Sequence, residues 1–349
     1  MKHWIAALGL GVFLLVAPVK AENIGDKAPA DIAAHLATNP PTDLNEYYDL
    51  RQHAGDVKFA AVISAATAHA YKVAGLEGVK FVSGCKLPQW YAPVQDGLLL
   101  AQAVTSEAEW QNWVREVKTR QTQYQTTWTD LSVGKIAHPD LDGIAATLKA
   151  THEALPPSTK ELSVRAARDQ FGRYGTMLTD QGLLWANDAS PPVLDYMKSY
   201  IYAELCATDI SNTNWLKAEL AQNGWFKIST HGPGADGNAW LLAQHADHDP
   251  AFQRDVLALL EPLVATGDTR PSNFAMLYDR VALKDKRPQR YGSQGTCVAA
   301  GVWEPFEVED PAHLDARRAK VGLPPIDIYK AGFNSICTAD MVALRGQIK

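Results

Sequence analysis

The stretch DPAFQRDVLALLEPLV, residues 249–264, decides the fold class of this chain. Its large apolar side chains recur at the 3.6-residue spacing of one helical face, namely Phe252, Val256, Leu259, Leu260 and Leu263. Asp249 is a typical N-cap residue, and Pro250 is favoured at the first helical position because its missing N–H is not needed there. The stretch therefore predicts an amphipathic helix packed on a core.

Helical patterning continues on both sides of this stretch. Proline breaks at 156–157 and 191–192 separate helical segments, and Asp209 or Ser211 is expected to cap a new helix that stops at Asn223-Gly224. Helices are expected over 59–73, 106–128, 158–174, 191–206, 211–223 and 238–248, and after Ser272 and Asp310. We therefore predict a mainly α protein, with a helical N-terminal region over residues 22–155 and a C-terminal helical domain over residues 158–349.

Residues 1–21 have the pattern of a cleavable export signal. A short basic start, Lys2-His3, precedes an apolar run from Trp4 to Val16, and Val19-Lys20-Ala21 supplies small residues before the cut. An uncleaved anchor is the alternative, but the apolar run is short for a bilayer span. We expect a periplasmic or secreted protein with no stable membrane span after cleavage.

The composition limits the classes of partner that the protein can have and indicates the state of its cysteines. The chain is 46% hydrophobic and 21% charged with a net charge of -6, which indicates a globular protein and argues against nucleic acid as a partner. Its four cysteines form no CxxC pair, so a zinc site is disfavoured and two disulfides are expected. Three connectivities exist, and we favour Cys85–Cys206 with Cys297–Cys337 over free buried thiols.

The run Gln244-His245-Ala246-Asp247-His248-Asp249 concentrates chemistry-bearing side chains. A carboxylate beside an imidazole can hold it in one tautomer, as a general base requires, although a buried histidine can also be purely structural. A metal set of His245, Asp247, His248 and His231 lacks a definite ligand spacing. Gly232-x-Gly234-x-x-Gly237 matches a dinucleotide fingerprint without its βαβ context. We therefore predict no metal and no cofactor.

The residues from 162 to 329 resemble an uncharacterised bacterial family, a domain of unknown function. The resemblance rests on these motifs in this order: Asp169-Gln170 with Arg173; Asp209 and Asn212; Gly224-Trp225; Gln244-His245-Ala246-Asp247; Asp279-Arg280-Val281; Gln289-x-Tyr291-Gly292-Ser293-Gln294; and Arg317-Arg318 before Gly322-Leu323-Pro324. It marks residues and implies no particular reaction.

These polar side chains are predicted to converge either on a pocket or in a closed internal network. In the pocket hypothesis His245 is the base of a hydrolase or related enzyme, Asp247 or Asp279 orients it, and Arg173 or Arg280 holds an anionic group. The expected ligand-binding residues are Gln170, Arg173, Gln244, Arg280, Gln289, Tyr291 and Gln294. A non-catalytic protein that binds a small polar or anionic ligand, and an interaction module with a structural network, are the two alternatives.

Overall fold

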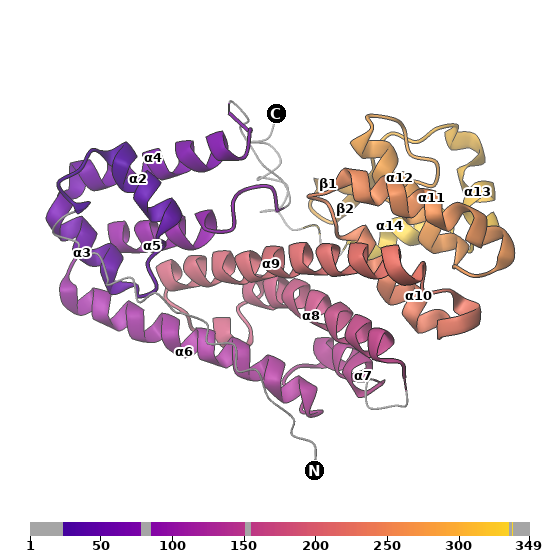
Figure 1. The fold of residues 1–349 in the computed structure, drawn as a ribbon, viewed down its shortest axis with the longest axis horizontal. Coiled ribbons are helices and arrows are strands. Elements are labelled where there is room, and N and C mark those ends of the chain that lie inside the picture. Colours follow the sequence, from indigo (N-terminus) through magenta and orange to yellow (C-terminus); the bar gives the residue numbers. More distant parts are fainter. Residues whose placement is uncertain (1–23, 78–84, 151–154, 335–336, 338–349) are drawn as a thin grey trace, which may run out of the picture.

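The computed structural model describes residues 24–77, 85–150, 155–334 and 337 (Figure 1). Helices joined by short connections make up most of this part of the chain, and one small hairpin is its only sheet. The mainly α prediction is therefore confirmed. The predicted export signal lies outside the described residues.

The N-terminal region is built of helices that share one core. They are α2 (Pro29–Thr38), α3 (Asn45–Ala54), α4 (Asp56–Val73), α5 (Tyr91–Ala103), α6 (Glu107–Ser132), the short η1 (Pro139–Leu141) and α7 (Asp142–Ala150). Ser106 begins α6 by accepting a hydrogen bond from the Glu109 amide at 3.3 Å, as an N-cap serine does. Trp110 on the same helix is wholly buried, which agrees with its apolar spacing in the sequence.

Two long helices connect this region to the rest of the chain: α8 (Pro157–Asp180), followed by η2 (Leu184–Ala186), and α9 (Pro191–Asn223). They lie side by side across the middle of the molecule (Figure 1). The N-terminal core extends into both, because it includes Phe171 of α8 and Ile201 of α9. Leu162 and Leu216, near the other ends of the same helices, belong to a second core. The boundary between the two cores therefore lies within α8 and α9.

The prediction of two helices over 191–206 and 211–223 is wrong, because α9 runs unbroken through both ranges. Asp209 does not cap a helix; it is 6% exposed and its carboxylate accepts hydrogen bonds from Arg173 of α8. A carboxylate with such a tertiary partner has no need of free backbone N–H groups at a helix start.

The second core lies among α10 (Ile228–Gln244), α11 (Pro250–Thr266) and α12 (Pro271–Lys284). Phe252, Val256 and Leu260 of α11 are buried, and Asp249 caps this helix by accepting from the Phe252 amide at 3.0 Å, as predicted. Gly232 has φ 81 and kinks α10 near its start, a backbone angle that favours glycine. The remaining elements are β1 (Gly295–Ala299), antiparallel to β2 (Val302–Pro305), then η3 (Pro311–His313), α13 (Leu314–Lys320) and α14 (Ile326–Asn334).

Two disulfides tie distant parts together. Cys85, before α5, is bonded to Cys206 of α9, and Cys297 of β1 is bonded to Cys337 beyond α14. The favoured connectivity is therefore confirmed. Among the helices of the described residues, none combines the length and apolar composition that crossing a membrane requires.

Candidate functional site

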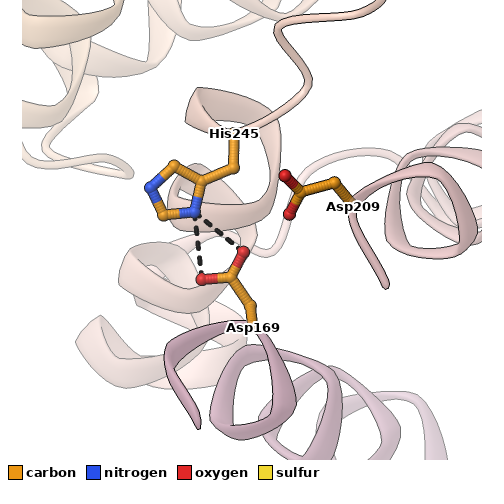
Figure 2. Close-up of side chains that lie close together, drawn as sticks. All are labelled: Asp169, Asp209 and His245. Carbon is orange, nitrogen blue, oxygen red and sulfur yellow. Dashed lines mark hydrogen bonds and ion pairs between the residues drawn. The ribbon is translucent and has the colours of Figure 1, made fainter. Parts of the chain in front are cut away.

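Three helices bring an imidazole, two carboxylates and a guanidinium together. Asp169 and Arg173 stand one turn apart on α8. Asp209 comes from the middle of α9, and His245 follows the last residue of α10; Figure 2 shows these two with Asp169. Asp169 is wholly buried, whereas the His245 side chain keeps 17% of its surface exposed. The cluster is therefore closed to solvent at Asp169 and open to solvent at His245.

His245 pairs with Asp169 through one ring nitrogen. Its Nδ1 lies 2.8 Å from Oδ1 and 3.0 Å from Oδ2 of the Asp169 carboxylate. The Asp169 carboxylate also accepts from the Gln170 side-chain amide at 2.8 Å. The second ring nitrogen, Nε2, lies on the side of the imidazole that faces away from both carboxylates (Figure 2). No hydrogen bond of Nε2 is found within the described part of the chain.

The tautomer of His245 follows from the charge of its partner. Arg173 Nε also lies 3.0 Å from Nδ1, so Nδ1 could either accept from Arg173 or donate to Asp169, but not both. Burial raises the pKa of Asp169, but His245, Arg173 and Gln170 outweigh it and bring that pKa to about 2. The ionised carboxylate can only accept, so Nδ1 carries the proton and Nε2 carries the free lone pair.

Burial lowers the pKa of His245, and the nearby Arg173 and Arg280 lower it further, although Asp169 opposes them. The imidazole is therefore neutral at pH 7. A neutral ring with its proton held on Nδ1 can accept a proton at Nε2, which is the chemistry of a general base.

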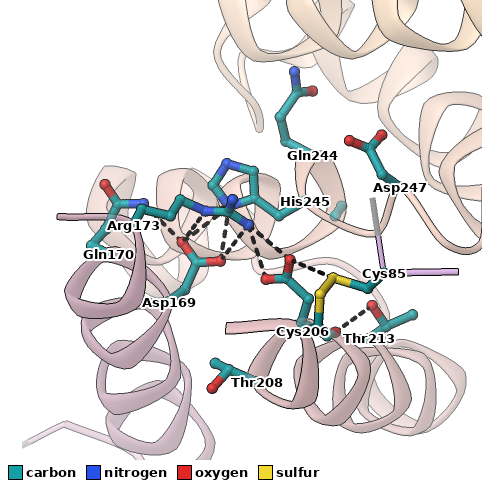
Figure 3. A network of polar contacts seen from close by, with 12 residues as sticks. Cys85, Asp169, Gln170, Arg173, Cys206, Thr208, Thr213, Gln244, His245 and Asp247 are labelled. Carbon is teal, nitrogen blue, oxygen red and sulfur yellow. Dashed lines mark hydrogen bonds and ion pairs between the residues drawn. A yellow bond between two sulfur atoms is a disulfide. The ribbon is translucent and has the colours of Figure 1, made fainter. Parts of the chain in front are cut away.

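Arg173 links the two carboxylates. Its Nη2 donates to Asp209 Oδ1 and Oδ2 at 2.9 and 3.0 Å, and Nε and Nη2 donate to Asp169 at 3.3 Å (Figure 3). Its side chain is 31% exposed, and no hydrogen bond of Nη1 is found among the residues that the structure describes. This guanidinium can therefore hold the network together and still bind an anionic group.

Asp209 is the second carboxylate of the pair. Burial raises its pKa, the charge of Asp169 adds to that effect, and Arg173 only partly offsets it, so the pKa of Asp209 is about 7. Because the charge of Asp169 raises the pKa of Asp209, the two carboxyls titrate as a pair, and Asp209 is the one that holds its proton to the higher pH.

Asp169, Asp209 and His245 also offer three ligand atoms that lie within 4.8 Å of one another. Arg173 already donates to both carboxylates, so a metal ion would have to displace a guanidinium that already supplies positive charge there. The metal set considered from the sequence is not grouped among the described residues: His231 makes an edge-to-face contact with Phe226, and Asp247 pairs with Arg280.

A separate ion pair stands beside this cluster. Asp247 Oδ2 accepts from Arg280 Nη1 at 2.6 Å, and Asp247 Oδ1 lies 3.6 Å from Lys284 Nζ. Burial raises the pKa of Asp247, but Arg280 and Lys284 bring it below its ordinary value. Gln244 is 5% exposed and its Oε1 has no partner among the described residues. Figure 3 shows Gln244 and Asp247 near His245, with both side chains directed away from Asp169.

Other residues of the predicted site organise a loop instead. Asp279 is wholly buried and accepts from the backbone N–H groups of Arg290, Tyr291 and Ser293 at 2.8, 3.0 and 2.8 Å. Gln289, also wholly buried, accepts from the Gln294 amide at 2.7 Å and donates to the Gln294 carbonyl at 2.8 Å. These contacts fix the 289–294 backbone, so Asp279 and Gln289 have a structural role here.

The sequence analysis expected Asp247 or Asp279 to orient the His245 imidazole. In the structure, the carboxylate that contacts His245 is that of Asp169. The carboxylate oxygens of Asp279 accept hydrogen bonds from backbone N–H groups, and those of Asp247 pair with Arg280 and Lys284. The sequence carried a usable signal, because Asp169 and Arg173 have the i,i+4 spacing of an ion pair on one helical face. Asp209 carried another, since it falls on the buried stripe of α9 with Leu205 and Leu216.

The fold and the cluster define a disulfide-linked helical protein with a buried Asp–Arg–Asp network that ends in a histidine. Residues 186–336 match a family of unknown function (DUF6624). The resemblance seen in the C-terminal motifs is thereby confirmed, with Asp209 and His245 inside the matched residues and Asp169 and Arg173 before them. Neither a curated protein nor a solved structure matches the chain.

Proposed function

We propose that this chain is an acid–base enzyme, most plainly a hydrolase, in which His245 Nε2 removes a proton from water or a substrate. One observation carries the proposal: the wholly buried Asp169 carboxylate lies 2.8 Å from His245 Nδ1. That contact holds the ring in the tautomer whose lone pair is on Nε2 and stabilises the imidazolium formed during the reaction.

The charges beside the imidazole favour an anionic substrate. Arg173 Nη1 has no hydrogen bond to any residue that the structure describes, and Arg280 is close enough to lower the pKa of His245. A guanidinium binds carboxylates and phosphates through paired N–H groups. Arg173 therefore holds the anionic group or the charge that develops in the transition state, in addition to its structural bonds to Asp169 and Asp209.

The predicted export signal and the two disulfides support a location outside the cytoplasm, where disulfides persist. On this proposal the protein acts as a periplasmic or secreted enzyme.

The proposal is tested by measuring substrate turnover and the tautomer of His245. Wild type, His245→Asn and Asp169→Asn are assayed with p-nitrophenyl acetate, p-nitrophenyl phosphate and bis(p-nitrophenyl) phosphate. We expect turnover of at least one probe and a loss of about 10²–10⁴-fold in both variants, because each removes the oriented base. His231→Asn is the matched control, since this half-buried histidine of α10 lies outside the cluster.

A ¹H–¹⁵N spectrum of the histidine side chains provides a readout that needs no substrate. We expect His245 to be protonated on Nδ1, and Asp169→Asn to change its tautomer. Turnover that survives in His245→Asn, or a His245 ring protonated on Nε2 in the wild type, would refute the proposal. A complete absence of turnover with all three probes would also count against it and favour the structural network.

A further inference from the structure

A cavity of about 220 Å³ lies between α5 and α9, beyond the Cys85–Cys206 disulfide from Asp209. Its walls are Leu87, Tyr91 and Ala92 on one side and Tyr202 and Ala203 of α9 on the other. The disulfide itself lines the cavity and holds the segment before α5 against α9. Cavities that bind drug-sized ligands are about 300–1,000 Å³, so this one suits a smaller molecule.

A single carboxylate stands in this largely apolar lining. Asp96 of α5 contributes to the wall, and its Oδ2 is buried without a hydrogen-bond partner among the described residues. No lysine or arginine in the described part of the chain forms an ion pair with it. Burial raises the pKa of Asp96 to about 7, and only the Ser199 hydroxyl opposes that shift.

An unpartnered carboxylate oxygen in a protein interior is costly, and such groups are normally satisfied by a partner. The Asp96 carboxyl would therefore be stabilised by a further donor and, when it is ionised, by a positive charge in the cavity. Tyr91 and Tyr202 line the cavity from its two sides, and aromatic faces attract organic cations. Thr67 fixes the position of Tyr91, since its Oγ1 lies 3.3 Å from the Tyr91 hydroxyl.

We propose that this cavity is a binding site for a small organic cation, a primary amine on a compact apolar or aromatic body, with its ammonium against the part of the Asp96 carboxylate that lines the cavity. The apolar walls hold the body and the carboxylate supplies the charge. The site is separate from His245 and does not depend on the acid–base function proposed above.

Isothermal titration calorimetry with benzylamine tests the site on the full chain at about pH 8.5, above the pKa of about 7 for Asp96. Benzyl alcohol, which has the same body without the charge, is the ligand control. We expect saturable binding of benzylamine, and dissociation constants at least about tenfold weaker for benzyl alcohol and for the Asp96→Asn variant. Asp195→Asn, an exposed acid on α9, should bind benzylamine like the wild type.

Ala92→Phe gives a second variant in case Asp96→Asn does not fold. The added ring occupies the cavity without touching the carboxylate chemistry, so benzylamine binding should be lost while the melting temperature stays near that of the wild type. No saturable binding of benzylamine up to about 20 mM, equal affinity for benzyl alcohol, or unchanged affinity in Asp96→Asn would overturn the proposal. Undiminished binding in Ala92→Phe would place the amine elsewhere and overturn it as well.

Discussion

Replacing Asp279 with asparagine tests whether this residue is a loop organiser. Its Oδ1 accepts from two backbone amides and its Oδ2 from the Ser293 amide at 2.8 Å, all from a wholly buried position. An asparagine can keep one acceptor oxygen, but its NH₂ group then faces a backbone N–H that has lost its acceptor. A buried unsatisfied group costs about 1–3 kcal/mol, so we expect Asp279→Asn to lower the free energy of unfolding by about 2 kcal/mol.

Alanine removes both oxygens and leaves three backbone N–H groups without an acceptor. The same arithmetic gives about 3–9 kcal/mol, which approaches the whole stability of an ordinary domain. Asparagine is therefore the variant to measure, and urea unfolding followed by circular dichroism gives its free energy. Hydrogen exchange should also show that the amides of Arg290, Tyr291 and Ser293 lose protection.

Asp255→Asn is the matched control, because this acid is exposed on α11 and should change stability by no more than about 0.5 kcal/mol. If Asp279→Asn were as stable as this control, the structural role assigned to Asp279 would be refuted. If it also lost turnover while keeping full stability, the earlier expectation of a catalytic Asp279 would be restored.

Two further predictions concern the charged pair and the disulfides. The folded state holds a proton on Asp209, whose pKa is about 7, that the unfolded chain releases near pH 4, so unfolding free energy should fall as pH rises through that interval. Asp209→Asn should make that slope shallower by up to about 1.4 kcal/mol per pH unit, whereas Asp195→Asn should leave it unchanged; equal slopes in wild type and Asp209→Asn would contradict the assignment. Removing Cys297–Cys337, which closes a loop with a sequence separation of 40, should cost about 4 kcal/mol in urea unfolding. Thiol counting on the denatured, unreduced protein should find no free thiol, and finding any would disprove the pairing.

Much of the fold could be predicted because its helices carry local signals. The apolar stripe of α11 and its Asp249 cap appear in the structure where the spacing placed them. Helix continuity was predicted less well, since the polar residues Asp209 and Ser211 resembled a helix start within α9. The hairpin of β1 and β2 was not predicted, because strands this short carry too few residues to establish a periodicity.

Only part of the candidate site could be predicted from the sequence. His245 and Arg173 were singled out from their motifs, and the structure places them in one cluster. Asp279 and Gln289 belonged to the same polar set, yet they serve the backbone of the 289–294 loop. A residue type and its spacing show that a polar group needs a partner, but they do not show whether that partner is a backbone amide, another side chain or a ligand.

The amino-acid sequence by itself determined the helical class and the motifs that match a family, because each depends on neighbours along the chain or on residue type. It also led us to favour one cysteine pairing, but the tertiary structure decided among the three connectivities. Only the tertiary structure decided that Asp169 orients His245 and that Arg173 connects Asp169 to Asp209. Those contacts join residues 76 and 36 positions apart. They exist because α8, α9 and α10 pack together and bury charges that must then find one another.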